Sequence, residues 1–211
     1  MCNLYDIAPL PRRIRAARTE ERLRETLDGL PHLHNLRRTE PGLVIRWAAD
    51  GWDPVLMRWG FQRDFNAAIN NARSDKLEGP MWREAFRKRR CVIPVAAYYE
   101  WTGPEGHKET HAMRRKDGAW LWAAGVWEPG NGGGPAYSMI TTDAAAWSRP
   151  IHDRMPAFLH EEEIDAWLRE DSPLERIRSW EEGLETFPCE NPLKTKTRQA
   201  PVPVPIQGML F

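Results

Sequence analysis

The chain has 211 residues and a mass of 24.4 kDa, which is enough for one domain with a substantial buried core. Its 30 Lys and Arg residues balance its 30 Asp and Glu residues, so any contact with nucleic acid must come from a local basic face or a shaped pocket. Three cysteines without metal-ligand spacing argue against a disulfide framework, and no apolar run is long enough for a membrane span.

The first half of the chain predicts two helices and several short strands. Residues 12–30 place apolar side chains at helical spacing among charges, which is typical of an amphipathic surface helix. Two extended runs within 43–60 meet at Asp50-Gly51 and predict a hairpin. A short strand at 68–73 then enters a polar loop, and residues 80–90 predict a short basic helix.

The second half is richer in strands. Residues 91–101 form one apolar run, and residues 110–128 predict a second hairpin that turns at Asp117-Gly118. A strand at 136–144 and an amphipathic helix at 161–171 follow. Many short antiparallel strands with few helices predict an α+β fold around a curled, largely antiparallel, barrel-like sheet with peripheral helices.

A change of composition at Phe187 predicts the domain organisation. From there the chain is rich in Pro, Lys and Thr, and PVPVPI is typical of an extended polyproline segment. We therefore predict one domain over residues 1–186 and a Pro-rich tail over 187–211.

Four polar stretches interrupt apolar context: MCN at the start, NNARSD, AAYYEW and PIHDRMP. The candidate residues in them are Cys2, Asn71, Arg73, Glu100, His152 and Arg154. Asn71 and Arg73 lie two apart, so they share one side of a strand. Each residue taken alone also fits an ordinary structural role, such as a solvated strand face or a packed loop histidine. Together they suit aldehyde chemistry beside a phosphate.

Cys2 is the residue with the most specific chemistry. Removal of Met1 would leave it with an α-amine and a thiol on adjacent carbons, and both groups reach their reactive forms near neutral pH. The amine can condense with an aldehyde to a Schiff base, and the thiol can then close a thiazolidine ring.

The motifs MC, NAR, YEW and IHDRMP, in this order, resemble the SRAP family of SOS-response-associated peptidases, over residues 1 to about 170. The resemblance implies a shield for abasic sites in single-stranded DNA that forms a covalent crosslink. It implies that Cys2 is the nucleophile, that Asn71 positions the terminus or the sugar, and that Arg73 grips a phosphate. It further implies that Glu100 assists proton transfer and that His152 handles protons in Schiff-base formation and release. We predict that Arg154 also binds a phosphate of the DNA.

The sequence also departs from the family pattern. Asn3 and Leu4 stand where many members have Gly and Arg, so DNA affinity is expected to depend more on Arg73 and on a basic run of Arg87, Lys88, Arg89 and Arg90. That run equally fits a solvated helix face. The terminal QGMLF resembles a bacterial sliding-clamp ligand through Gln207, Leu210 and Phe211, but these residues could instead dock on the protein's own core.

Two other functions stay open at this point. One is a cysteine hydrolase that uses Cys2 and His152 on peptides, and the other is a non-catalytic binder of single-stranded DNA or clamp adaptor. For the family function we expect no cofactor and no metal, a monomer, a lyase-like activity with self-removal of Met1, and a bacterial cytoplasmic location near the nucleoid during repair.

Overall fold

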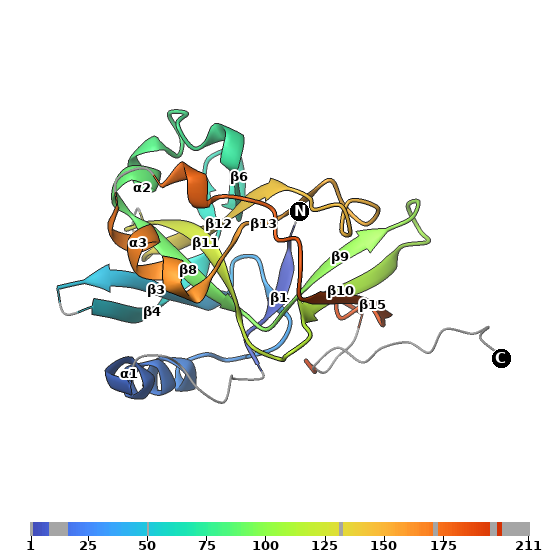
Figure 1. The fold of residues 1–211 in the computed structure, drawn as a ribbon, viewed down its shortest axis with the longest axis horizontal. Coiled ribbons are helices and arrows are strands. Elements are labelled where there is room, and N and C mark those ends of the chain that lie inside the picture. The colour runs from blue at the N-terminus through green and yellow to red at the C-terminus, as the bar shows by residue number, and fades with distance from the viewer. Residues whose placement is uncertain are drawn as a thin grey trace.

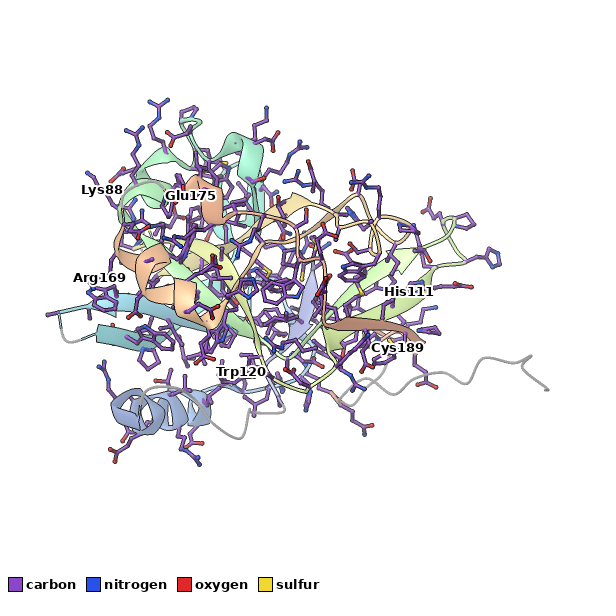
Figure 2. The ribbon with its side chains drawn as sticks, in the orientation of Figure 1. Lys88, His111, Trp120, Arg169, Glu175 and Cys189 are labelled. Carbon is purple, nitrogen blue, oxygen red and sulfur yellow. The ribbon has the colours of Figure 1, made fainter. Side chains whose placement is uncertain are left out.

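A computed structural model of the chain describes residues 2–8, 17–49, 51–130, 133–170, 173–194 and 198–199, without the side chains of residues 17–20. Two curved sheets form its centre, and short helices lie outside them (Figure 1). This arrangement confirms the predicted α+β class. Figure 2 shows that charged side chains such as Lys88 lie at the periphery, whereas Trp120 lies in the interior.

The larger sheet closes on itself. Its strands are β13 (Arg154–Pro156), β12 (Ala136–Asp143), β4 (Gly51–Trp59), β3 (Pro41–Ala48), β8 (Arg90–Val95), β11 (Leu121–Glu128) and β14 (Phe158–Leu159), with β7 (Asn71–Arg73) paired to β12. Because β12 pairs with both β4 and β11, the path β12-β4-β3-β8-β11 forms a ring. The pairs that β12 forms with β4 and β7 are parallel and the others are antiparallel. The predicted barrel-like sheet is therefore present.

The smaller sheet carries the N-terminal strand. Its order is β15 (Leu184–Cys189), β10 (Glu109–Arg115), β9 (Ala97–Thr102), β1 (Leu4–Asp6) and β2 (Leu36–Arg37). A separate two-stranded ribbon consists of β5 (Phe61–Arg63) and β6 (Asn66–Ile69). The strand β15 continues past residue 186, so residues 187–189 belong to the sheet rather than to the predicted tail.

One predicted hairpin is confirmed and the other is wrong. Strands β3 and β4 pair along their whole length up to Ala48 and Gly51, on either side of the predicted turn. The strands on either side of Asp117-Gly118 do not pair with each other, because β10 lies in the smaller sheet and β11 in the larger. The real hairpin turns at residues 103–108, where Gly103 and Gly106 have positive φ angles.

That hairpin is long and bent. Its outer half pairs β9 with β10, and its inner half pairs β8 with β11. The predicted single run at 91–101 bends at Ala96, whose N–H donates to the Asp6 carbonyl at 2.7 Å. The turn at Asp117 lies where the returning strand crosses between the sheets, and its carboxylate accepts the Ala119 N–H at 3.0 Å.

Three α-helices and three 3-10 turns cover the sheets: α1 (Ala17–Asp28), α2 (Arg83–Lys88), α3 (Ile164–Arg169), η1 (Ser74–Lys76), η2 (Glu161–Glu163) and η3 (Leu174–Arg176) among the described residues. Helix α3 buries Ile164, Trp167 and Leu168, as its pattern predicts. No helix in these described ranges is long and apolar enough to cross a membrane. The predicted clamp motif at Gln207, Leu210 and Phe211 lies outside the described residues and stays a prediction.

Candidate active site

The site is built around the backbone of Cys2. Strand β1 follows it and pairs with β9, with Tyr5 opposite Tyr98. The Cys2 carbonyl accepts two side-chain hydrogen bonds, from Asn70 Nδ2 at 2.9 Å and from Asn71 Nδ2 at 2.8 Å. The whole residue is buried, and its thiol donates to the Leu4 carbonyl at 3.5 Å. The N-terminal segment is therefore held at a fixed place in the protein.

The side chains of Asn70 and Asn71 both reach the Cys2 carbonyl, because the chain leaves strand geometry at Asn70. Strand β6 ends at Ile69 and β7 begins at Asn71, which leaves Asn70 outside both. The Asn70 carbonyl accepts the Trp59 indole N–H at 3.1 Å and the Met139 amide at 3.0 Å, which fixes its backbone. Its side chain also donates to Asn3 Oδ1 at 3.1 Å. The sequence interpretation missed Asn70, although the doubled NN was its visible signal.

Glu100 lies on β9 and is only 3% exposed. Burial raises the pKa of its carboxyl to about 7, and the nearby Asp153 carboxylate contributes to the rise. Burial also raises the pKa of the Cys2 thiol far above its ordinary value, and Glu100 adds to that effect. The two groups therefore lie within electrostatic range of each other, and near neutral pH the carboxyl can exchange a proton.

Tyr98 is a second residue that the sequence interpretation did not select. It lies two residues before Glu100 on the same face of β9, and its buried hydroxyl has no hydrogen-bond partner among the described residues. Burial raises the pKa of this phenol, and both Glu100 and Cys2 add to the rise. A neutral phenol thus lies beside the two reactive groups.

His152 lies in the loop before β13. Its Nδ1 accepts the Arg154 amide N–H at 3.0 Å and lies 2.8 Å from Asp153 Oδ1. Burial lowers the pKa of the imidazole, so it is largely neutral at pH 7. Since Asp153 also acts on Glu100, this loop faces the same site.

Arg73 and Arg154 differ sharply in exposure. The Arg73 side chain is 52% exposed and forms a bidentate pair with Asp75 at 3.0 and 2.9 Å. The Asp75 carboxylate raises the pKa of the Arg73 guanidinium, and the charges of Asp143 and Asp153 add to the rise, which places Arg73 near the histidine loop. The Arg154 guanidinium is buried, where it donates to Asp143 Oδ1 at 2.5 Å and to the Thr141 carbonyl at 2.6 Å. Arg154 therefore joins β12 and β13, and its contact with a phosphate stays a prediction.

The predicted basic run lies apart from Cys2. Helix α2 is at one side of the molecule, whereas the N-terminus lies near its middle (Figure 1). Arg87 pairs with Glu78 at 3.0 Å, Arg89 pairs with Glu84 at 3.0 Å, and Lys88 is exposed. Their proposed contact with DNA remains a prediction.

Arg90 does not share this exposure, because it begins the buried strand β8. Its guanidinium donates to the carbonyls of Phe86 at 2.6 Å, Arg87 at 2.7 Å, Trp167 at 2.7 Å and Glu170. A group that is buried and bound in this way cannot reach a phosphate, which corrects the prediction for Arg90.

A basic groove begins next to Cys2. It has a volume of about 760 Å³, and its lining includes Asn3, Arg37, Arg38, Trp101 and Lys108. The Nε atom of Arg37 is buried without a hydrogen-bond partner among the described residues. We refer to this surface as the Asn3 groove. Its lining offers cations and an aromatic ring, the groups that bind single-stranded nucleic acid.

Solved structures with a similar fold support the architecture. A protein from Bacteroides thetaiotaomicron superposes with a TM-score of 0.71 and 20% identity over 92% of this chain and 95% of its own. A Bordetella bronchiseptica protein gives a TM-score of 0.70 and 22% identity over 90% of this chain and 100% of its own.

Curated relatives are similar in sequence as well. The abasic site processing protein YoqW of Bacillus subtilis is 32% identical over 59% of this chain and 55% of its own length. The abasic site processing protein HMCES of Xenopus tropicalis is 33% identical over 57% of this chain and 47% of its own. This chain spans about half the length of these relatives, and about a third of the abasic site processing protein YMR114C of Saccharomyces cerevisiae, where the match covers 34%.

The family model described as SOS response associated peptidase (SRAP) matches residues 1–194, which include all the residues of the site described above. The match extends beyond residue 170, where the resemblance in the motifs ends, and reaches past the last strand of the smaller sheet. This chain therefore belongs to the SRAP family.

Proposed function

We propose that this protein recognises abasic sites in single-stranded DNA and captures them covalently through Cys2 after Met1 has been removed. The observation that carries the proposal is the double hydrogen bond from Asn70 and Asn71 to the Cys2 carbonyl. It fixes Cys2 by its carbonyl oxygen and engages neither the nitrogen nor the sulfur that the chemistry requires. The names of the curated relatives supply the substrate class.

The reaction begins with opening of the abasic sugar. In this proposal Glu100, with a pKa of about 7, donates a proton to the ring oxygen while the C1′ hydroxyl loses one, which gives the aldehyde. The Cys2 amine then adds to C1′, and loss of one water gives a Schiff base. His152 is placed to accept and return protons during this dehydration.

Ring closure completes the capture. The Cys2 sulfur adds to the C=N carbon, and the thiol proton goes to the nitrogen, so a thiazolidine forms without any oxidant. Arg73 holds a flanking phosphate through its fork of donors after release from Asp75. In the same proposal, these groups also serve the self-removal of Met1 that frees the Cys2 amine.

The burial of the Cys2 thiol disfavours the cysteine-hydrolase alternative. A thiolate nucleophile needs a lowered pKa and an adjacent imidazole. Here burial raises the thiol pKa, and the thiol donates to the Leu4 carbonyl instead. In the proposed reaction the amine attacks first, so a neutral thiol is sufficient. A non-covalent binder would not require the proton-exchanging Glu100.

Intact mass spectrometry tests the proposal. The untagged protein is measured with and without a single-stranded oligonucleotide that carries one abasic site. We expect loss of Met1 and a heat-stable adduct whose mass is the sum of both partners minus one water. The adduct should disappear in Cys2→Ala and in a protein with a blocked N-terminus. A mature protein that forms no adduct would overturn the proposal, and a Cys2→Ala variant that still binds the oligonucleotide would then support the binder.

A further inference from the structure

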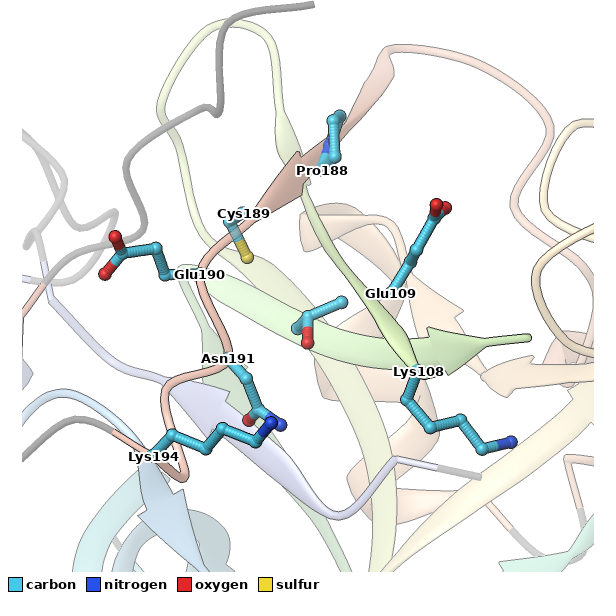
Figure 3. A pocket seen from close by; sticks show the side chains of 8 residues that line it. Lys108, Glu109, Pro188, Cys189, Glu190, Asn191 and Lys194 are labelled. Atoms are coloured by element: carbon cyan, nitrogen blue, oxygen red, sulfur yellow. The ribbon is translucent and has the colours of Figure 1, made fainter. Parts of the chain in front are cut away.

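A second cavity lies between β10 and β15, on the face of the smaller sheet opposite Glu100. Its volume is about 570 Å³ (Figure 3). Thr110 forms its floor and is in register with Trp101 on β9 and with Cys189 on β15, so these side chains share one face. Glu100 is in register with His111 and points to the other face. We call this cavity the Thr110 cavity.

The cavity presents hydrogen-bond donors. Thr110 lines the cavity, and its buried hydroxyl has no hydrogen-bond partner in the described part of the chain. The Asn191 side-chain carbonyl already accepts the Leu193 amide at 3.0 Å, which leaves its NH₂ group to face outward. Lys108 and Lys194 add two ammonium groups, and neither has an ion-pair partner among the residues that the structure describes.

The negative charges lie at the edge. In Figure 3 the carboxylates of Glu109 and Glu190 point away from the centre of the cavity, on opposite sides. The Cys189 thiol points inward, but burial raises its pKa to about 11, so it is uncharged at neutral pH. A hydroxyl, an amide and two ammonium groups without a central negative charge form a site for an anion.

The Thr110 cavity continues from the Asn3 groove, because Lys108 and Asn191 line both. We propose that the Thr110 cavity binds a backbone phosphate of the DNA strand that the Asn3 groove leads away from Cys2. This inference rests on the proposed function. The Asn3 groove separates the cavity from Cys2, so the phosphate belongs to a nucleotide beyond the one that carries the aldehyde.

The salt dependence of binding tests this site separately from the chemistry. The full-length protein is titrated with single-stranded DNA that carries a tetrahydrofuran abasic analogue, which cannot open to an aldehyde. Each phosphate contact on a single strand contributes about 0.7 to the slope of log K against log salt. We expect Lys194→Gln to reduce that slope by about 0.7 and to weaken binding several-fold at low salt. Thr110→Val should weaken binding without changing the slope.

The matched control is Lys116→Gln. Lys116 is an exposed lysine in the turn between β10 and β11 and lines neither the groove nor the cavity. The salt slope and the DNA affinity of Lys116→Gln should equal those of the unaltered protein. An unchanged slope in Lys194→Gln would overturn the proposal. Binding of inorganic phosphate that depends on Lys194, with no effect on the strand, would also overturn it and would indicate a site for a free anion.

Failure of this inference is distinguishable from failure of the proposed function. Adduct formation with a true abasic oligonucleotide reports on the covalent chemistry at Cys2, whereas the change of salt slope between the unaltered protein and Lys194→Gln reports on the Thr110 cavity. An adduct together with an unchanged slope would remove only the phosphate site. A reduced slope without any adduct would support the site and contradict the covalent capture.

Discussion

The two asparagines hold the backbone of residue 2 and make no hydrogen bond to its side chain. Replacement of Cys2 therefore leaves both hydrogen bonds possible, so a Cys2→Ala protein should retain the local structure of the site. This property makes the variant a clean control, since a lost adduct then reports lost chemistry rather than lost folding. It also means that the position of the amine is set before any substrate arrives.

Glu100 links catalysis to stability at the scale of one residue. Burial raises its pKa from 4.5 to about 7, so the folded state prefers the neutral form. Stability from this preference is complete below about pH 4.5 and is lost as the pH rises through 7. Glu100→Gln mimics the neutral form, so above pH 7 it should unfold with a free energy higher by on the order of 3 kcal/mol.

The same variant should lose activity. Without a proton donor, the rate of adduct formation should fall by roughly 10²- to 10⁴-fold, and the decline of the rate above pH 7 should vanish. Urea unfolding at pH 4 and pH 8 and gel-based adduct kinetics measure the two effects. If the unaltered protein and Glu100→Gln were equally stable at pH 4 and also at pH 8, the buried neutral carboxyl would be contradicted. An unchanged rate of adduct formation would remove Glu100 from the chemistry.

At the scale of elements, one hydrogen bond joins the sheet that carries Cys2 to the closed ring. Tyr5 on β1 and Tyr137 on β12 share a hydrogen bond at 2.6 Å. Gly42 on β3 lies against both hydroxyls, because a Cβ at this position would overlap each of them. The glycine therefore lets the strand that follows Cys2 approach the ring.

Gly42→Ala should separate this tyrosine pair. We expect a loss of about 1–3 kcal/mol in the free energy of unfolding, since overpacking forces side chains and backbone to shift. Gly133→Ala is the control, because nothing lies within 4 Å of a Cβ there. Thermal and urea unfolding of both variants give the comparison. A Gly42→Ala protein as stable as Gly133→Ala would show that β1 tolerates displacement.

The sequence predicted the elements better than their pairing. Asp50-Gly51 and Asp117-Gly118 look alike, yet only the first lies within a hairpin, because the choice of partner strand depends on distant residues. Period-two alternation correctly placed Asn71 and Arg73 on one face of the strand and the buried Ala72 on the other. It could not reveal Asn70, because alternation assumes an unbroken strand. Arg90 was misjudged because only the fold shows that a charged run ends inside a buried strand.

At the scale of the whole molecule, a net charge of zero leaves local surfaces to decide where DNA binds. Two candidates lie apart: the exposed cations of helix α2 and the Asn3 groove beside Cys2. The groove is contiguous with the site, and its Arg37 has a buried Nε atom without a partner in the described ranges. Arg87 on α2 already pairs with Glu78, and Arg89 directly after α2 pairs with Glu84.

Charge removal distinguishes these surfaces. Arg38→Gln in the groove should raise the half-saturating DNA concentration several-fold and lower the salt slope by about 0.7. Lys88→Gln on α2 is the matched change and should alter neither value. Fluorescence anisotropy over a range of salt concentrations measures both. A larger effect of Lys88→Gln would return the DNA path to the basic run.

The bent hairpin has a consequence for how the protein loses its structure. Its two arms run from one sheet into the other, so the chain joins the two sheets along both arms of the hairpin. The segment that carries Glu100 thus belongs to the same cooperative unit as the closed ring. Cys2 should therefore lose its fixed position in the same transition in which the closed ring unfolds.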